Sequence, residues 1–286
     1  MSERIAILTD TNSGLTTEEA NQLGVHLLAM PVIVNNETYF ENESISQKVF
    51  FECLRRGENI STSQPAPGIL MDCWDELLLN YDEVLYIPMS SGLSGSFLTA
   101  SMFAESYNGK IYVVDNHRIS VALRQSVVEA NYLMRQGKTA REIADYLETD
   151  GLESSIYIAV NTLEWLKKSG RVTPAGAAVG TILNIKPVLQ IQGGKLDAYR
   201  KVRGMRQAMQ AMIQGLKQDQ ANRFLNQNLA IRAAYSGNAE LGLVWQDTLQ
   251  KAFPDISIGL DPLPISICCH TGEDAIGVGM MKNILC

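Results

Sequence analysis

Short apolar runs alternate with amphipathic segments along the first half of the chain. The runs at residues 4–10, 84–87 and 110–115 are typical of strands buried on both faces. Apolar residues with helical spacing lie between them, and two of these segments open on Thr-x-x-Glu capping boxes at Thr16 and Thr139. Because strands and helices alternate, we expect a parallel sheet with helices on both faces.

The first half contains two further strands and another helix. Residues 26–34 and 37–40 are expected to be strands joined by a tight turn at Asn35 and Asn36. Residues 46–56 then place four apolar side chains on one face of a helix. All three elements are assigned to the first domain.

The second half of the chain has a different pattern, in which short strands and a hairpin predominate. Strands are expected at residues 155–160, 188–202 (a hairpin turning at Gly193 and Gly194), 229–235, 256–260 and 264–269. Helices are expected at residues 162–169, 203–218 and 238–253. We therefore predict two α/β domains: residues 1–152 with a parallel sheet in an α/β/α arrangement, and residues 153–286 with a mixed, largely antiparallel sheet.

The composition indicates an acidic globular protein. With 46% hydrophobic residues, 19% charged residues and a net charge of −7, the chain lacks the basic surface that nucleic acid binding requires. The N-terminal sequence contains neither a signal peptide nor a membrane span, so we expect a cytoplasmic protein without stable membrane insertion. Five cysteines form no CxxC pair and three histidines share no ligand spacing, so no metal site is expected.

Residues 90–96, SSGLSGS, stand out because four serines and two glycines lie between a predicted strand and a predicted helix. Ligands of open α/β sheets bind at the carboxyl ends of strands, and the first turn of a helix offers unpaired N–H groups to an anion. The hydroxyls are neutral donors that could hold a carboxylate or a phosphate. The same residues could equally form a capped turn, and the loop alone does not separate the two interpretations.

Three other stretches are candidates for the same site. Residues 61–68, STSQPAPG, place three hydroxyls before two prolines, which predicts either a rigid loop without regular pairing or local helix caps. Asp10 is expected to start an Asx turn after the first strand. His270 is expected directly after the strand at residues 264–269, where it could reach a ligand.

A basic cluster interrupts the otherwise acidic second half. It contains Arg200, Lys201, Arg203 and Arg206. A solvated face is the default interpretation, and recognition of an acidic partner or a carboxylate is the alternative.

A serine-dependent hydrolase or acyltransferase is the enzyme to consider, with Ser94 as nucleophile and His270 as base. The nucleophile elbow of such enzymes has the pattern G-x-S-x-G. In residues 92–96 the second glycine comes one position early, which weakens this interpretation. A phosphate-binding loop would need a lysine after the glycine-rich turn, and none occurs there.

Four motifs in order resemble the DegV family of bacterial fatty-acid-binding proteins, which serve as carrier subunits of a fatty acid kinase. They are STSQP at 61–65, SSGLSGS at 90–96, LKKSGRV at 166–172 and HTGEDAIG at 270–277. The resemblance extends from Ile5 to the C-terminus. It implies two α/β domains with a fatty acid between them, its carboxylate at the interface and its tail in an apolar tunnel.

Carried over by motif, Thr62 and Ser94 look like the direct carboxylate donors, with His270 and Arg203 close behind. Arg171 looks like a structural or kinase-facing residue. The resemblance implies a non-catalytic carrier in phospholipid synthesis, with a long-chain fatty acid as ligand, no cofactor and the kinase catalytic subunit as partner. Secondary candidates for contacting the ligand are Ser63, Ser91, Gly95 and Thr271.

The chain departs from the family pattern at two places. The usual His-Thr-Gly-Pro-Gly is HTGED here, with Glu273 and Asp274, and the usual Gly-Gly-Arg is the sequence 169–171, SGR. The two acids are expected to repel the phosphates of a partner. The tail-lining residues carry no motif, so chain length and unsaturation are left open.

Overall fold

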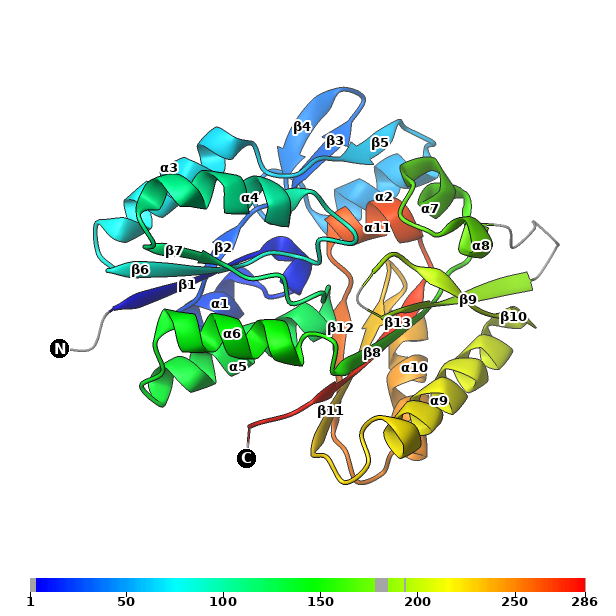
Figure 1. Cartoon of the computed structure of the whole chain (residues 1–286). Helices are drawn as coiled ribbons and strands as arrows, with labels where there is room; N and C mark the ends of the chain where they lie inside the picture. Colours follow the sequence, from blue (N-terminus) through cyan, green and yellow to red (C-terminus); the bar gives the residue numbers. More distant parts are fainter. Residues whose placement is uncertain (1–3, 178–184, 193, 286) are drawn as a thin grey trace. The chain divides into compact units, whose positions relative to one another are not determined.

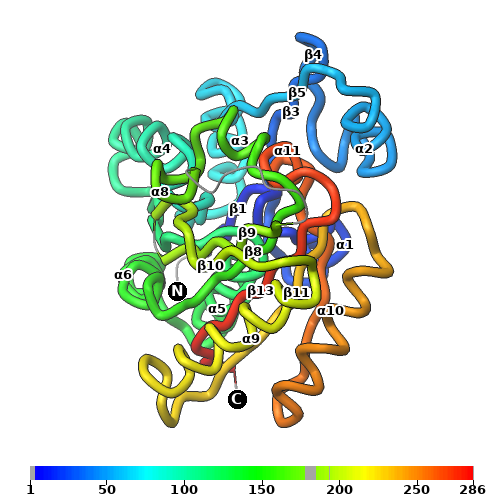
Figure 2. The backbone as a smooth tube through the Cα atoms, turned by 90° about the vertical axis from the view of Figure 1, so that its right-hand side faces the viewer, coloured from blue at the N-terminus to red at the C-terminus, as the bar shows by residue number. Residues whose placement is uncertain are grey.

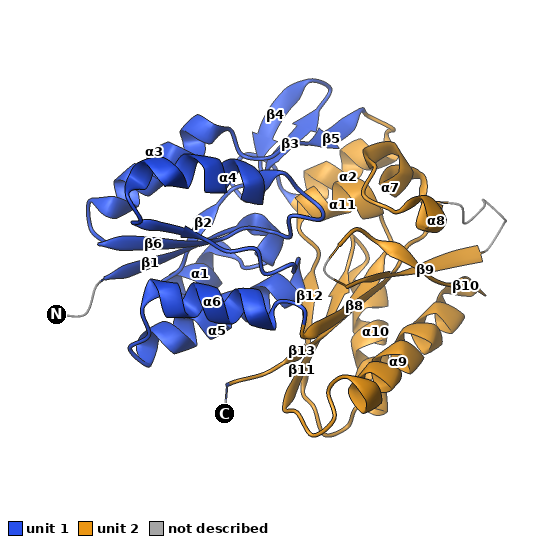
Figure 3. Cartoon of the chain, in the orientation of Figure 1, with its two compact units in different colours: residues 1–46, 59–152, 285 blue, residues 47–58, 153–284, 286 orange. Residues whose placement is uncertain are grey.

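The computed structural model describes residues 4–177, 185–192 and 194–285 (Figure 1). The chain divides into two compact units (Figure 3). The first comprises residues 1–46, 59–152 and 285, and the second comprises residues 47–58, 153–284 and 286. The segment 47–58 therefore groups with the second unit, whereas we had assigned it to the first domain.

The first unit contains a four-stranded parallel sheet in the order β2-β1-β6-β7. This confirms the predicted parallel sheet. Its strands are β1 (Ile5–Asp10), β2 (His26–Leu28), β6 (Glu83–Ile87) and β7 (Ile111–Val113). Its helices are α1 (Thr17–Leu23), α3 (Pro67–Leu78), α4 (Ser96–Ala104), α5 (Val121–Arg135) and α6 (Ala140–Asp150), with short 3₁₀ turns η1 (Thr11–Ser13) and η2 (Glu105–Tyr107).

Helices cover both faces of this sheet, as the uninterrupted apolar strands predict (Figure 2). Ile5 and Ile7 of β1 pack with α5 and α6, whereas Ala6 and Leu8 pack with α3 and α4. Both predicted capping boxes are present, at the first turns of α1 and α6. The two hydroxyl-rich stretches, residues 61–68 and 90–96, lead into α3 and α4, which pack on the same face of the sheet.

A small antiparallel sheet, β4-β3-β5, completes the first unit. Its strands are β3 (Pro31–Val34), β4 (Glu37–Phe40) and β5 (Ile60–Thr62). The predicted hairpin turn is confirmed, with Asn35 and Asn36 both at positive φ.

Two predictions fail in this region. Residues 26–34 are two strands in different sheets, because Pro31, which has no N–H to donate, starts a new strand. Ser61 and Thr62 are paired with β3, contrary to the predicted unpaired loop. The pairing ends at Thr62, before Pro65.

The second unit contains a six-stranded sheet in the order β10-β9-β8-β13-β11-β12. All neighbouring pairs are antiparallel except β11 with β12, which confirms the predicted mixed, largely antiparallel sheet. Gly193, of the predicted hairpin turn between β9 and β10, lies outside the described residues. The strands are β8 (Ser154–Ala159), β9 (Ile185–Ile191), β10 (Asp197–Arg203), β11 (Leu229–Tyr235), β12 (Ile258–Pro262) and β13 (Ile276–Lys282).

Two long helices of the second unit pack on its sheet around Trp245, whose Nε1 donates to Gly277 O (2.7 Å). The two long helices are α9 (Gly204–Asn222) and α10 (Ala239–Ala252). The shorter helices of the unit's described residues are α2 (Gln47–Arg55), α7 (Glu164–Ser169), α8 (Pro174–Ala177) and α11 (Ile265–Thr271). No helix in the described ranges is long and apolar enough to cross a bilayer.

The strand predicted at residues 264–269 is wrong, because this segment begins the buried helix α11. A short apolar run is compatible with a buried strand or a buried helix, and here Pro264 precedes the first turn while Gly272 follows the last. The final strand, β13, was missed, because its glycines and methionines give no strong strand signal.

Candidate functional site

The serine loop connects the carboxyl end of β6 to the first turn of α4. Ser94 Oγ lies 2.8 Å from Ser96 Oγ and accepts a hydrogen bond from Ser96 N (3.2 Å). Gly95 occupies the N-cap position without a side-chain cap. Ser94 therefore partly fills the cap role, yet its half-buried hydroxyl lies at the helix terminus, where an anion can accept a hydrogen bond from it.

Three successive backbone N–H groups, those of residues 89–91, hold the start of this loop. The first donates to Asp10 Oδ2 (3.1 Å), the second to Arg118 O (2.9 Å) and the third to Asp115 Oδ1 (3.2 Å). The acceptors lie at the end of β1 and in the segment that follows β7, and these strands are the two neighbours of β6. The loop is thus fixed from both sides at the carboxyl edge of the sheet.

Asp10 is fully buried at this edge. Its Oδ1 accepts from Asn12 N (3.0 Å) and Nδ2 (2.9 Å), which confirms the predicted Asx turn. Burial raises the pKa of Asp10 to about 6, against the opposing effect of the hydrogen bonds from Met89 and Asn12. Asp10 therefore forms the Asx turn and also holds the start of the serine loop through its hydrogen bond from Met89 N.

The loop after β5 lies beside the serine loop in the first unit. Gln64 Nε2 donates to Thr99 Oγ1 (3.0 Å), and Thr99 Oγ1 donates to Gln64 Oε1 (3.2 Å). A side chain at Gly95 would place its Cβ 2.8 Å from Gln64 Oε1, so the two segments are in close contact. The structure thus brings together the STSQP and SSGLSGS stretches, which carry Thr62 and Ser94.

The remaining first-unit candidates lie around these two residues. Thr62 ends β5 and is half-buried, whereas Ser63 is exposed. Ser91 is half-buried and held through its backbone by Asp115. The segments 61–64 and 90–96 contain no cationic side chain. They offer hydroxyl and amide donors to an anion.

His270 lies in the last turn of α11 in the second unit, not after a strand as we expected. Burial, together with the smaller effect of the nearby Arg171 charge, lowers its pKa to about 4. The imidazole is therefore neutral at pH 7 and can donate one hydrogen bond. Thr271 is buried, and its Oγ1 donates to Ile267 O (3.3 Å).

The two predicted arginines also belong to the second unit. Arg203 ends β10 as the N-cap residue of α9, its side chain is exposed, and its backbone N donates to Gln207 Oε1 (3.1 Å). Arg171 is half-buried, and its Nη1 donates to Ser169 O (2.6 Å). This contact fits the structural role considered for Arg171.

The two acids that depart from the family pattern have local partners within the second unit. Glu273 accepts from Arg55 Nη2 (2.5 Å) and Nε (3.1 Å), which ties α2 to the turn before β13. Asp274 has φ +61° and accepts from Asn238 Nδ2 (3.0 Å). Glu273 is thus paired with a cation, whereas Asn238 is a neutral partner of Asp274, and the expected repulsion of a partner's phosphates stays a prediction.

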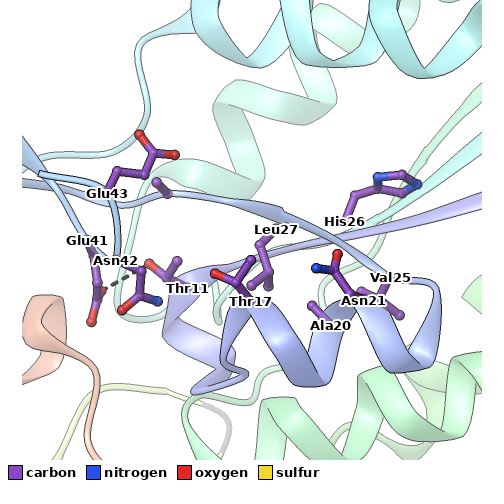
Figure 4. A pocket seen from close by; sticks show the side chains of 11 residues that line it. Thr11, Thr17, Ala20, Asn21, Val25, His26, Leu27, Glu41, Asn42 and Glu43 are labelled. Carbon is purple, nitrogen blue, oxygen red and sulfur yellow. Dashed lines mark hydrogen bonds between the residues drawn. The ribbon is translucent and has the colours of Figure 1, made fainter.

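A separate pocket of about 330 Å³ lies elsewhere in the first unit (Figure 4). Its lining comes from α1, β2 and the turn after β4, and it includes Thr17, Asn21, His26 and the segment 41–43. At its edge Thr11 Oγ1 donates to Glu41 Oε2 (3.0 Å). None of the predicted site residues lines this pocket.

Asp115 offers a test of the support behind the serine loop. Its Oδ1 accepts from both Ser91 N (3.2 Å) and His117 N (3.3 Å). Asp115→Ala leaves both amides without this acceptor. We therefore expect the affinity for the fatty acid that the resemblance implies to fall by about tenfold, the equivalent of 1–2 kcal/mol, as measured by titration calorimetry. Asp115→Asn keeps the accepting oxygen and should bind nearly as the wild type; equal losses in both variants would contradict the proposed support.

His270 offers a pH test. Because its folded pKa is below the unfolded value of 6.5, the neutral form stabilises the fold above pH 6.5, and this contribution is lost as pH falls toward 4. We expect the unfolding free energy of ligand-free wild type, relative to His270→Asn, to fall by about 2 kcal/mol between pH 7 and 5. Asp10 titrates in both proteins and cancels. Urea titrations that give a constant difference across this range would refute the burial effect.

Comparisons with known proteins agree on one family. The sequence model of the DegV family, described as uncharacterised, matches residues 4–283. A DegV domain-containing protein of Deinococcus radiodurans is 31% identical over 281 residues, covering 96% of this chain and 98% of that protein.

Two solved structures resemble the chain over nearly its whole length. A fatty-acid-binding DegV family protein of Thermus thermophilus superposes with a TM-score of 0.89 at 27% identity, covering 98% of this chain and 99% of its own. DegV of Bacillus subtilis, described as a fatty acid binding protein, gives 0.87 at 26% identity, covering 99% and 100%. The match therefore includes both units.

Proposed function

This chain belongs to the DegV family, and from that premise we propose that it binds a long-chain fatty acid whose carboxylate is held by Thr62 and Ser94. The observation that carries the proposal is the contact between the two hydroxyl-bearing segments, in which Gln64 lies against Gly95 and bonds to Thr99 of α4. Relatives from Thermus thermophilus and Bacillus subtilis are described as binding fatty acids, which supports the same ligand class.

Neutral donors suit a ligand whose affinity comes mainly from its tail. Burial of an alkyl chain contributes about 0.8 kcal/mol per methylene, so the head group needs satisfied hydrogen bonds more than a countercharge. A carboxylate buried without partners would cost several kcal/mol. Hydroxyls at the first turn of α4 meet this requirement, together with the positive end of the helix dipole.

For the second unit, the proposal assigns supporting contacts to His270 and Arg203. A neutral imidazole can donate one hydrogen bond to a carboxylate oxygen, and a guanidinium can complement its charge. Each substitution, His270→Gln and Arg203→Gln, should weaken fatty acid binding less than loss of Ser94. Secondary contacts of the ligand are proposed for Ser63, Ser91, Gly95 and Thr271.

We further propose that the protein is a carrier rather than an enzyme. Ser94 Oγ is hydrogen-bonded to the Ser96 hydroxyl, which is not a base at neutral pH. The bound carboxylate keeps one oxygen for reaction: a separate kinase transfers the γ-phosphoryl group of ATP to it, giving an acyl phosphate and ADP. Reconstitution with a fatty acid kinase catalytic subunit and trapping of the product with hydroxylamine tests this step, and the carrier role requires product only when both proteins are present.

The alternative is a hydrolase or acyltransferase that uses Ser94 and His270. A fluorophosphonate probe separates the two functions, because only an activated serine is labelled covalently. The carrier proposal expects no labelling of wild type above that of Ser94→Ala. Labelling that depends on both Ser94 and His270 would favour the enzyme.

Direct binding is tested by titrating delipidated protein with oleate and with palmitate. The proposal expects one mole of fatty acid per mole of chain and an affinity that falls when Ser94 is replaced by alanine. Absence of binding for both ligands would overturn it.

A further inference from the structure

Positive charge is concentrated on the segment 185–206, which forms β9, β10 and the first turn of α9. It holds six of the 24 basic residues and one of the 31 acidic residues, so its net charge is +5 while the rest of the chain carries −12. In Figure 1, β10 lies at the end of the second unit's sheet, next to α9. We call the exposed cations of this segment the basic strip; they are Lys195, Arg200, Lys201, Arg203 and Arg206.

The basic strip makes no ion pair within the described part of the chain. Arg200 Nη1 donates to the neutral amide of Gln214 (2.6 Å). Several exposed or half-buried arginines elsewhere pair with carboxylates, as Arg55 does with Glu273 and Arg232 with Asp261. A chain with a surplus of acids thus leaves its most basic surface without internal countercharge.

Helix stability does not account for the basic residues of α9. Arg203 is the N-cap residue and Arg206 lies in the first turn of this 19-residue helix, which has no acidic residue there. The N-terminus is the positive end of the helix dipole, so cations are unfavourable at this position. The helix dipole and the side chains of Arg203 and Arg206 therefore both contribute positive electrostatic potential at the N-terminus of α9.

Part of the β10 backbone also has no partner strand within the described ranges, although Arg203 N donates to Gln207 Oε1 (3.1 Å). Residues 200–203 pair with β9 on one side, and no strand in the described ranges pairs with their other side. The beginning of β10 differs, because Val172 forms a bridge with Leu196. Basic residues on an edge strand can prevent aggregation, which explains Arg200 and Lys201 but not Arg206 on the helix.

We propose that the basic strip docks an extended acidic segment of a partner protein, which adds to the free edge of β10 as a further strand. Main-chain hydrogen bonds would give affinity, and carboxylates spaced along the segment would meet Arg200, Lys201 and Arg206. A bilayer is disfavoured because segment 185–206 has no large apolar side chain among the strongly exposed ones described. The −12 charge on the rest of the chain disfavours a long polyanion.

The test uses a fluorescent peptide of about ten residues in which pairs of adjacent glutamates alternate with pairs of threonines, because Arg200 and Lys201 are adjacent on β10 and lie on opposite faces of the sheet. It is titrated at low salt and followed by anisotropy. The triple variant Arg200→Gln, Lys201→Gln, Arg206→Gln should bind it at least about tenfold more weakly than wild type. The matched control, Arg4→Gln, Lys138→Gln, Lys251→Gln, removes the same charge from exposed ion pairs and should lose less than about twofold. Arg203 stays unchanged because it has a proposed role toward the fatty acid.

Hydrogen exchange separates strand addition from loose charge attraction. Bound peptide should slow exchange of amides in residues 200–203, and phosphatidylglycerol vesicles or inorganic polyphosphate should not. Equal affinities of the two triple variants, or strip-dependent binding of vesicles or polyphosphate without peptide binding, would overturn the proposal. Fatty acid content, measured on the same samples, should not differ among the variants, so failure here is distinguishable from failure of the lipid-binding function.

Discussion

Thr62→Val combined with Ser94→Ala is expected to lower fatty acid affinity by at least about 100-fold. Each substitution removes one proposed hydrogen bond to a carboxylate, and a bond to a charged group contributes about 1.5–3 kcal/mol. Losing both therefore costs about 3–6 kcal/mol, or two to four orders of magnitude in Kd. Calorimetric titration of delipidated protein with oleate measures the effect.

A matched control removes the same atoms from exposed positions of the first unit. Ser106→Ala and Thr149→Val delete hydroxyls that donate to backbone carbonyls of Phe103 (2.7 Å) and Asp145 (2.8 Å). This double variant should bind oleate as the wild type does. If the Thr62 and Ser94 variant also binds within threefold of wild type, the head-group assignment is wrong.

Arg118→Met is expected to destabilise the protein by about 3–5 kcal/mol. The guanidinium is fully buried and donates to Asp150 Oδ2 (2.8 Å), Asp150 O (2.7 Å) and Ser126 Oγ (3.0 Å). Glu129 Oε2 lies 3.8 Å away. Methionine fills a similar volume but leaves two buried carboxylates without their cation. Urea unfolding measures the change.

Arg141→Met is the control for this prediction. Arg141 pairs with Asp145 on the exposed surface of α6 (3.4 Å), and such pairs contribute at most about 1 kcal/mol. Its unfolding free energy should stay within 1 kcal/mol of wild type. A loss below 1.5 kcal/mol for Arg118→Met would show that the buried carboxylates take up protons or water without much cost.

The fold could be predicted where local patterns decide it. The apolar runs at β1 and β6 alternate with helical patterns and are correctly predicted as buried strands, and the capping boxes at Thr16 and Thr139 mark two helix starts. Helix α11 could not be predicted, because five apolar or small residues before His270 satisfy either secondary structure. Grouping α2 with the second unit depends on contacts such as Arg55 with Glu273, which are distant in sequence.

Candidate residues of the site could be predicted where a local sequence pattern marks them. Composition singles out the hydroxyl-rich stretches, and the family resemblance picks Thr62 and Ser94 within them; their role toward a carboxylate stays a prediction. The supporting roles of Asp115 and Gln64 were not predicted, because they depend on hydrogen bonds to residues distant in sequence, Ser91 and Thr99, which leave no local pattern. Gln64 belongs to the STSQP motif, so the motif could have indicated this residue, whereas composition alone did not.

Native mass spectrometry of the purified protein tests the central claim most directly, followed by denaturation and identification of the released molecule. The account predicts a mass increment of one fatty acid per chain in the wild type, and its loss in the Thr62→Val and Ser94→Ala variant. A wild-type mass without an increment, unchanged after incubation with oleate and palmitate, would contradict fatty acid binding.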